Sequence, residues 1–170
     1  MRINKGYWIW GLFSSRETNL LNKIKAKVQS KLKSPVFETH ITLGGPYLDI
    51  DKTFLNKLKT FGESNSRITL NVDGFDFKQE KFKSFYLSIK NSKHLRELRK
   101  NICELNKFDL DNNYFPHISL SYGNHEKKEK KILISKLHEF NIPIKISKIA
   151  LVEVNEDINL WKILETFDLN

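Results

Sequence analysis

The sequence predicts an α+β fold (an α/β-type duplication) with two pseudo-symmetric β-α-β-α-β lobes. Patterns typical of strands and helices occur twice along the chain in the same order. The two copies are offset by a constant 77 residues, which places His117 on His40 and Leu98 on Leu21. Because the chain has 170 residues, we expect one bilobal domain over 1–170, with repeats at roughly 6–76 and 83–154 and a closing strand over 161–169.

The elements of the first copy follow from local patterns. Aromatic and β-branched residues at 6–13 predict a buried strand. Ser14 and Glu17 predict a capping box for the next helix, which Pro35 ends. The rest of this copy is expected to contain a strand over 36–43 that Gly44, Gly45 and Pro46 stop, a helix over 51–61 with Gly62 as its C-cap, and an alternating strand over 67–75.

The second copy repeats this order. A strand is expected over 84–89, and a helix follows Ser92 because Leu95, Leu98, Ile102 and Leu105 recur at helical spacing. The lysine-rich run "EKKEKK" predicts a solvated helix face. The remaining elements are a strand over 115–122, a helix over 127–140, one or two strands over 142–154, a turn at "NEDIN" and the closing strand.

Charge and cysteine content narrow the classes of function. The formal net charge is +9, from 29 basic and 20 acidic residues, which favours polyanionic or phosphate-bearing ligands. A general compositional bias toward lysine is an equal alternative. The single cysteine, Cys103, excludes an intramolecular disulfide and a multi-cysteine zinc site, and it fits a reducing compartment.

The N-terminal stretch resembles a secretory signal only in having a basic start and an apolar run. That run has seven residues, includes two tryptophans and lacks a small-residue cleavage pattern. No segment approaches the length of a transmembrane span. We therefore expect a cytoplasmic protein with no membrane partner, and a monomer.

Two short motifs carry the functional signal. His40 and Thr42 stand two apart in an otherwise apolar run, and His117 and Ser119 do the same in the second copy. Since side chains alternate along a strand, each pair projects from one face while the apolar residues beside it face the core. If the lobes pack about a pseudo-twofold axis, the two pairs converge on one cleft.

Two imidazoles facing each other across a phosphate can act as an acid–base pair. The neutral ring takes a proton from water and the imidazolium donates one to the leaving oxygen. The two hydroxyls can donate hydrogen bonds to the non-bridging phosphate oxygens. A strained cyclic phosphodiester suits this arrangement, which requires no metal and no cofactor.

Structural histidines and a metal site are the alternatives. A lone His-x-Thr is more often structural than catalytic, but two copies at equivalent positions reverse that preference. Zinc bound by His40 and His117 lacks a third ligand at suitable spacing. The other histidines lack a hydroxyl at the second position after them, and we expect them on the surface; they are His94, His125 and His138.

The chain resembles the two-histidine (2H) phosphoesterase superfamily, and within it the cyclic phosphodiesterase branch. "YWIWGL" is similar to that branch's opening strand, "FETHITL" to its first motif and "FPHISLSYG" to its second. The tail "IALVEVNEDINLWKILETFDL" resembles its closing hairpin. The likeness extends over nearly the whole chain. Family motifs commonly have proline before the histidine, and Thr39 replaces it in the first copy while Pro116 keeps it in the second.

The resemblance implies antiparallel-rich sheets around a central groove and metal-independent hydrolysis of small cyclic phosphates. The implied substrates are ADP-ribose 1'',2''-cyclic phosphate and nucleoside 2',3'-cyclic phosphates, opened to monoester phosphates. RNA ends or 2',5'-oligoadenylates are alternative substrates, and a non-catalytic nucleotide- or RNA-binding module is a second alternative.

By the same resemblance His40 and His117 are catalytic, with His117 favoured as base, and Thr42 and Ser119 bind phosphate. Trp10 corresponds to an aromatic residue of the base pocket and Tyr122 to a substrate contact. Strand alternation places Tyr122 on the face opposite His117 unless the strand ends or twists before Gly123.

Overall fold

The computed structural model describes residues 6–107, 110 and 113–170. In chain order the elements are β1 (Gly6–Phe13), α1 (Ser15–Gln29), β2 (Ile41–Tyr47), α2 (Lys52–Ser64), β3 (Ile68–Leu70), β4 (Val72–Asp76), β5 (Phe85–Ile89), α3 (Lys93–Leu105), β6 (His117–Ser121), α4 (Lys127–Lys136), β7 (Ile144–Val154) and β8 (Lys162–Asp168). Two short 3-10 turns, η1 (Lys81–Lys83) and η2 (Ile158–Leu160), precede β5 and β8. None of the helices in these described ranges has the length and apolar character needed to cross a bilayer.

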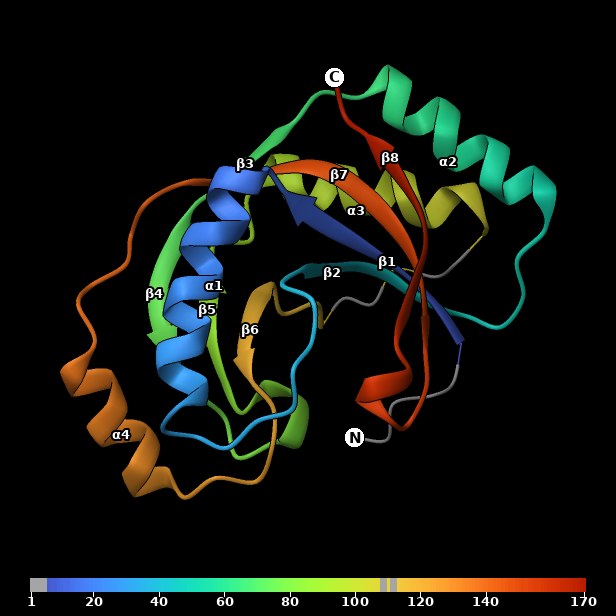
Figure 1. Cartoon of the computed structure of the whole chain (residues 1–170). Helices are drawn as coiled ribbons and strands as arrows, with labels where there is room; N and C mark the ends of the chain where they lie inside the picture. The colour runs from blue at the N-terminus through green and yellow to red at the C-terminus, as the bar shows by residue number, and fades with distance from the viewer. Residues whose placement is uncertain (1–5, 108–109, 111–112) are drawn as a thin grey trace.

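The strands form one antiparallel sheet in the order β3-β7-β1-β2-β6-β5-β4, and β8 pairs with β7. Its two halves join through one narrow link, the pairing of Ile41 in β2 with Ile118 in β6. In Figure 1, α2 and α3 lie beside the half that contains β1, β2, β7 and β8, and α1 lies over the half that contains β4, β5 and β6. The predicted α+β fold with antiparallel strands is confirmed.

Strands of the two sequence repeats are exchanged between the halves of the sheet. β1 begins the first repeat and pairs with β7, which ends the second. In the corresponding way β5 begins the second repeat and pairs with β4, which ends the first. Each half of the sheet is therefore completed by a strand from the other repeat.

The apolar residues of the two motif strands anchor them in the core. Ile41 and Leu43 of β2, and Ile118 and Leu120 of β6, are fully buried in one continuous hydrophobic cluster. Burying a large aliphatic side chain stabilises the fold by about 1.5–3 kcal/mol. Since neighbouring side chains on a strand face opposite sides, this anchoring turns Thr42, His117 and Ser119 away from that cluster.

The first motif strand differs from its prediction. Residues 36–40 belong to no regular strand, and β2 instead runs from Ile41 through the glycines and proline to Tyr47. Gly45, with φ at +114°, makes this possible, since a Cβ there would lie 2.8 Å from the Tyr7 carbonyl oxygen of β1. The Gly-Gly-Pro segment allows the close approach of β1 and does not stop the strand.

Other boundaries differ because of contacts distant in sequence. The single strand predicted over 67–75 divides into β3 and β4, which pair with different halves of the sheet. Helix α2 continues past Gly62 to Ser64, so Gly62 lies inside the helix. Helix α4 ends at Lys136, and its Lys130 is buried and donates to the Lys78 carbonyl at 2.7 Å, so this lysine of the predicted solvated run is not solvated.

Candidate active site

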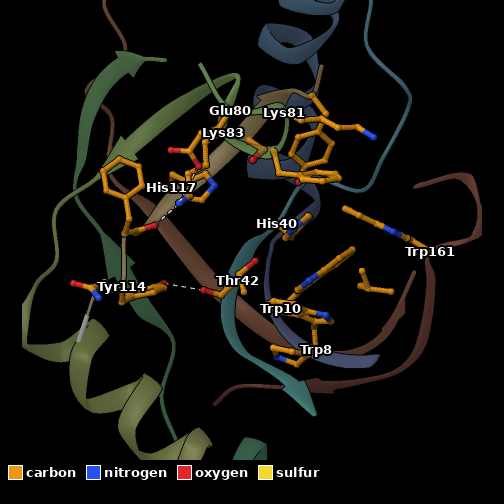
Figure 2. Close-up of a pocket in the computed structure, with 17 residues that line it drawn as sticks. Trp8, Trp10, His40, Thr42, Glu80, Lys81, Lys83, Tyr114, His117 and Trp161 are labelled. Atoms are coloured by element: carbon orange, nitrogen blue, oxygen red, sulfur yellow. Dashed lines mark hydrogen bonds and ion pairs between the residues drawn. The ribbon is translucent and has the colours of Figure 1, made fainter. Parts of the chain in front are cut away.

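A pocket of about 250 Å³ is lined by residues from both halves of the sheet. Figure 2 shows His40, which directly precedes β2, and His117 of β6 projecting into it, with Thr42 and Trp10 below them. The structure brings together in this one pocket all six residues that the sequence singled out, namely Trp10, His40, Thr42, His117, Ser119 and Tyr122.

The two histidines make the same backbone hydrogen bond. Nδ1 of His40 lies 2.7 Å from the Glu38 carbonyl oxygen, and Nδ1 of His117 lies 2.8 Å from that of Phe115. Because a carbonyl oxygen can only accept, each Nδ1 carries the hydrogen. In the neutral rings Nε2 therefore bears the lone pair, and each ring can take up a proton there.

Burial keeps both imidazoles neutral. It lowers the pKa of His40 to about 3, with smaller lowering contributions from Lys25 and His117, against the raising effect of the bond to Glu38. Burial also lowers the pKa of His117, and Lys83 and Lys78 lower it further, while the bond to Phe115 raises it. Both rings are therefore unprotonated near neutral pH and available as bases.

Trp10 packs flat against His40. The ring centroids are 3.6 Å apart with an interplanar angle of 6°, and Trp10 is only 3% exposed. One face of the indole is thus occupied by the imidazole. An indole face attracts a cation, so Trp10 both orients His40 and offsets part of the cost that burial places on its protonated form.

The two hydroxyl-bearing residues of the motifs are held differently. Thr42 is half-buried, and its backbone carbonyl accepts a hydrogen bond of 2.8 Å from the Tyr114 hydroxyl. Ser119 is buried, and a hydrogen bond joins its side chain to that of Tyr122. Strand β6 ends at Ser121, so Tyr122 lies beyond the alternating segment and can face the pocket. Burial raises the pKa of Tyr122 to about 12.

A buried lysine holds the segment that leads to His40. Lys25 of α1 is 5% exposed, and its Nζ donates to the Phe37 carbonyl and to Thr39 Oγ1. Thr39 in turn donates to Asn22 Oδ1 at 2.7 Å. This network replaces strand pairing for a segment that has none. It also gives a role to Thr39, which stands where the second motif has Pro116.

A similar arrangement supports the second motif. The Arg99 guanidinium of α3 lies 3.6 Å above the Tyr114 ring, and Lys25 Nζ lies 3.8 Å above the Phe37 ring. Each aromatic residue stands three positions before a motif histidine. Arg99 also donates to the Leu43 carbonyl at 3.0 Å, which ties α3 to β2. A cation from a helix thus packs on an aromatic ring of each histidine segment, Lys25 on Phe37 and Arg99 on Tyr114.

Sequence reasoning missed part of the lining. Trp161 follows η2 and lies edge-on to Trp10 at 5.7 Å between ring centroids, while η1 contributes a second group of residues. The sequence did offer one signal for these residues, since each of two polar hairpin turns contains an aromatic residue, Phe82 or Trp161. The lining residues of η1 and its cap are Glu80, Lys81, Phe82 and Lys83.

The remaining histidines lie outside this pocket. His94 and His138 are exposed, as expected, whereas His125 is half-buried with Nε2 at 3.2 Å from Ser121 Oγ. Within the part of the chain that the structure describes, no three histidine, cysteine or acidic side chains group as metal ligands would.

Comparison with known proteins identifies relatives. A family profile described as the 2'-5' RNA ligase superfamily matches residues 15–158. No curated protein sequence matches the chain.

Solved structures share the fold at low identity. They include the protein TT0787 of Thermus thermophilus, at 14% identity and a TM-score of 0.65 over 99% of this chain and 98% of that one. A phosphoesterase matches at 13% identity and 0.66 over 99% of both chains, and E. coli LigT complexed with 3'-AMP at 13% and 0.64 over 98% of both.

Proposed function

Because the chain belongs to the 2'-5' RNA ligase superfamily, the two-histidine phosphoesterases, we propose that it is a metal-independent cyclic phosphodiesterase acting on small cyclic phosphates. The observation that carries the proposal is the pair of imidazoles in one pocket, each with Nδ1 bonded to a backbone carbonyl. Nothing else that the described residues place in the pocket offers a comparable acid–base pair.

In the proposed reaction a water molecule attacks the phosphorus of the cyclic diester. One Nε2 takes the water's proton as the new P–O bond forms, and the other protonated Nε2 gives a proton to the ring oxygen as the opposite P–O bond breaks. The product is a monoester phosphate with a free hydroxyl beside it. The two histidines have then exchanged protonation states and return to the starting state by exchange with solvent.

The family resemblance favours His117 as the base. Burial, and to a smaller extent Lys83 and Lys78, lowers the pKa of this ring against the raising effects of the Phe115 bond and Glu80, so the ring is neutral when water binds. His40 must be protonated to act as the acid, so its lowered pKa has to rise when substrate binds, and both the Trp10 indole and the negative charge of a bound phosphate act in that direction. Lys25 opposes protonation of His40, which makes that ring a strong acid once it is protonated.

The hydroxyls of Thr42 and Ser119 complete the proposed site. Both line the pocket within the motifs that hold the histidines, and both can donate to non-bridging phosphate oxygens. Donors already in place where charge gathers in the transition state lower the barrier without reorganisation. E. coli LigT, which shares this fold, has been crystallised with 3'-AMP, and this supports a nucleotide as the ligand.

The test is turnover in excess EDTA with ADP-ribose 1'',2''-cyclic phosphate and the four nucleoside 2',3'-cyclic phosphates. We expect hydrolysis to monoesters by the wild-type protein and a loss of at least about a thousandfold in His40→Ala and in His117→Ala. His94→Ala, an exposed histidine outside the pocket, is the matched control. Turnover only of RNA ends or 2',5'-oligoadenylates would replace this proposal, and binding without turnover would indicate a binding module.

A further inference from the structure

The pocket contains cations that the proposed chemistry does not use. Lys81 and Lys83 of η1 both line it, together with the carboxylate of Glu80. The groups assigned to the reacting phosphate are two imidazoles and two hydroxyls, all neutral in the free protein. A phosphate diester is an anion, and a nucleotide substrate often carries more than one such group.

The two lysines differ in their relation to the histidines. Lys83 Nζ lies 3.5 Å from the Glu80 carboxylate, and its charge lowers the pKa of His117. Lys81 is exposed and is not among the charges that shift the pKa of either catalytic histidine. Lys81 belongs to none of the ion pairs that the described residues form. Its Nζ lies 5.1 Å from the centroid of the Phe82 ring, so this exposed cation lies beside an aromatic residue of the pocket lining.

Aromatic rings lie beside this cation. Phe82 and Trp161 both line the pocket, with ring centroids 6.4 Å apart and an interplanar angle of 28°. They come from the two hairpin turns on opposite halves of the sheet, and Figure 2 shows Lys81 across the pocket from Trp8 and Trp10. Aromatic faces stack on flat bases, so a nucleotide placed here runs from the histidines past these rings toward η1.

We propose that Lys81 forms a second anion subsite, which takes a phosphate group of the substrate other than the one that is hydrolysed. The inference rests on the proposed function and names the preferred substrates within it: cyclic phosphates that carry a further phosphate group. Plain nucleoside 2',3'-cyclic phosphates fill only the catalytic part of the pocket. The pairing of Lys83 with Glu80 leaves Lys81 as the cation of η1 that serves this subsite.

The test measures binding, so that it does not depend on turnover. Titration calorimetry compares adenosine 2'-monophosphate with adenosine 2',5'-bisphosphate, which differ by one phosphate group. We expect the wild-type protein to bind the bisphosphate about tenfold more tightly, as a charge-assisted contact provides. Lys81→Gln should bind both ligands equally, and the wild-type preference should shrink as salt is added.

Lys59→Gln is the matched control, because it removes the same charge from an exposed position on α2. It should keep the tenfold preference. Equal binding of the two ligands by the wild-type protein, a preference that survives in Lys81→Gln, or no binding of either ligand would each overturn the subsite. Turnover of adenosine 2',3'-cyclic phosphate by the same preparations tests the proposed function separately, since that substrate lacks the second phosphate.

Discussion

His40 and His117 make the same hydrogen bond through Nδ1, yet their surroundings differ, and we propose different tasks for them. His40 lies on an indole face, and His117 lies near two lysines and Glu80. This difference predicts how each variant responds to a leaving group that needs no proton. With a p-nitrophenyl phosphodiester, loss of the general acid lowers kcat/KM little because p-nitrophenolate leaves without a proton. Loss of the general base lowers kcat/KM as much as it does on the cyclic phosphate.

We therefore expect His40→Ala to retain most of its activity on the p-nitrophenyl substrate while losing activity on the cyclic phosphate. His117→Ala should lose both. The measurement is kcat/KM for each variant on each substrate at pH 7. The reverse pattern would assign the base to His40, and equal losses on both substrates would contradict separate acid and base roles.

The depressed pKa of His40 also predicts how stability depends on pH. Its pKa is about 3 in the folded chain and about 6.5 when unfolded, so the unfolded state binds more protons between these values. Stability should be complete above pH 6.5 and fall as the pH decreases, by up to about 1.4 kcal/mol per unit from this residue. Urea unfolding of the wild-type protein and of His40→Gln at pH 6.5 and 5 checks this.

The wild-type protein should lose up to about 2 kcal/mol more than His40→Gln over that interval. His94→Gln, at an exposed position, should follow the wild type. Parallel curves for the wild type and His40→Gln would show that His40 is protonated as readily in the folded protein as in the unfolded chain.

Helix α2 provides a prediction at the scale of single elements. Gly to Ala inside a helix ordinarily stabilises by about 1 kcal/mol. At Gly62 a Cβ would lie 2.7 Å from the Asp168 carbonyl oxygen of β8, so Gly62→Ala should instead destabilise by about 1–3 kcal/mol. Asn56→Ala, exposed on the same helix, should be neutral or slightly stabilising. Thermal unfolding of both variants is the measurement, and a higher Tm for Gly62→Ala would contradict this packing.

The helices and strands also show which features of the fold could be predicted from the sequence. β1 and α3 form where the pattern placed them, because strand composition and a Ser92 cap act within a few residues. The division of 67–75 could not be foreseen, since it depends on two partners far along the chain, β7 and β5.

The site follows the same rule. The paired motifs identified the histidines and hydroxyls, because these residues recur at equivalent positions of the repeat. Trp161 and the η1 lysines belong to turns whose meeting depends on how the two halves of the sheet pack. Lys25 lacked any signal, because only the fold shows that this residue of a charged helix is buried.

At the scale of the whole molecule, the exchanged strands predict that neither repeat folds alone. A fragment of residues 1–79 keeps β1 but loses β7, and a fragment of residues 80–170 keeps β5 but loses β4. Each would expose an unpaired strand and apolar surface. We expect both fragments to lack cooperative unfolding separately and to recover it when mixed in equal amounts, as circular dichroism on heating would show. Cooperative melting of either fragment by itself would contradict this.

The strand exchange also bears on ancestry. A half-length ancestor with one imidazole–hydroxyl pair would have had an unpaired first strand and half a site. Two identical copies related by a twofold axis would have solved both problems by exchanging their last strands, as domain-swapped homodimers do. In such a dimer both histidines would already face one pocket. Joining the copies into one chain would then have freed each half to diverge, as the difference between Thr39 in the first motif and Pro116 in the second illustrates.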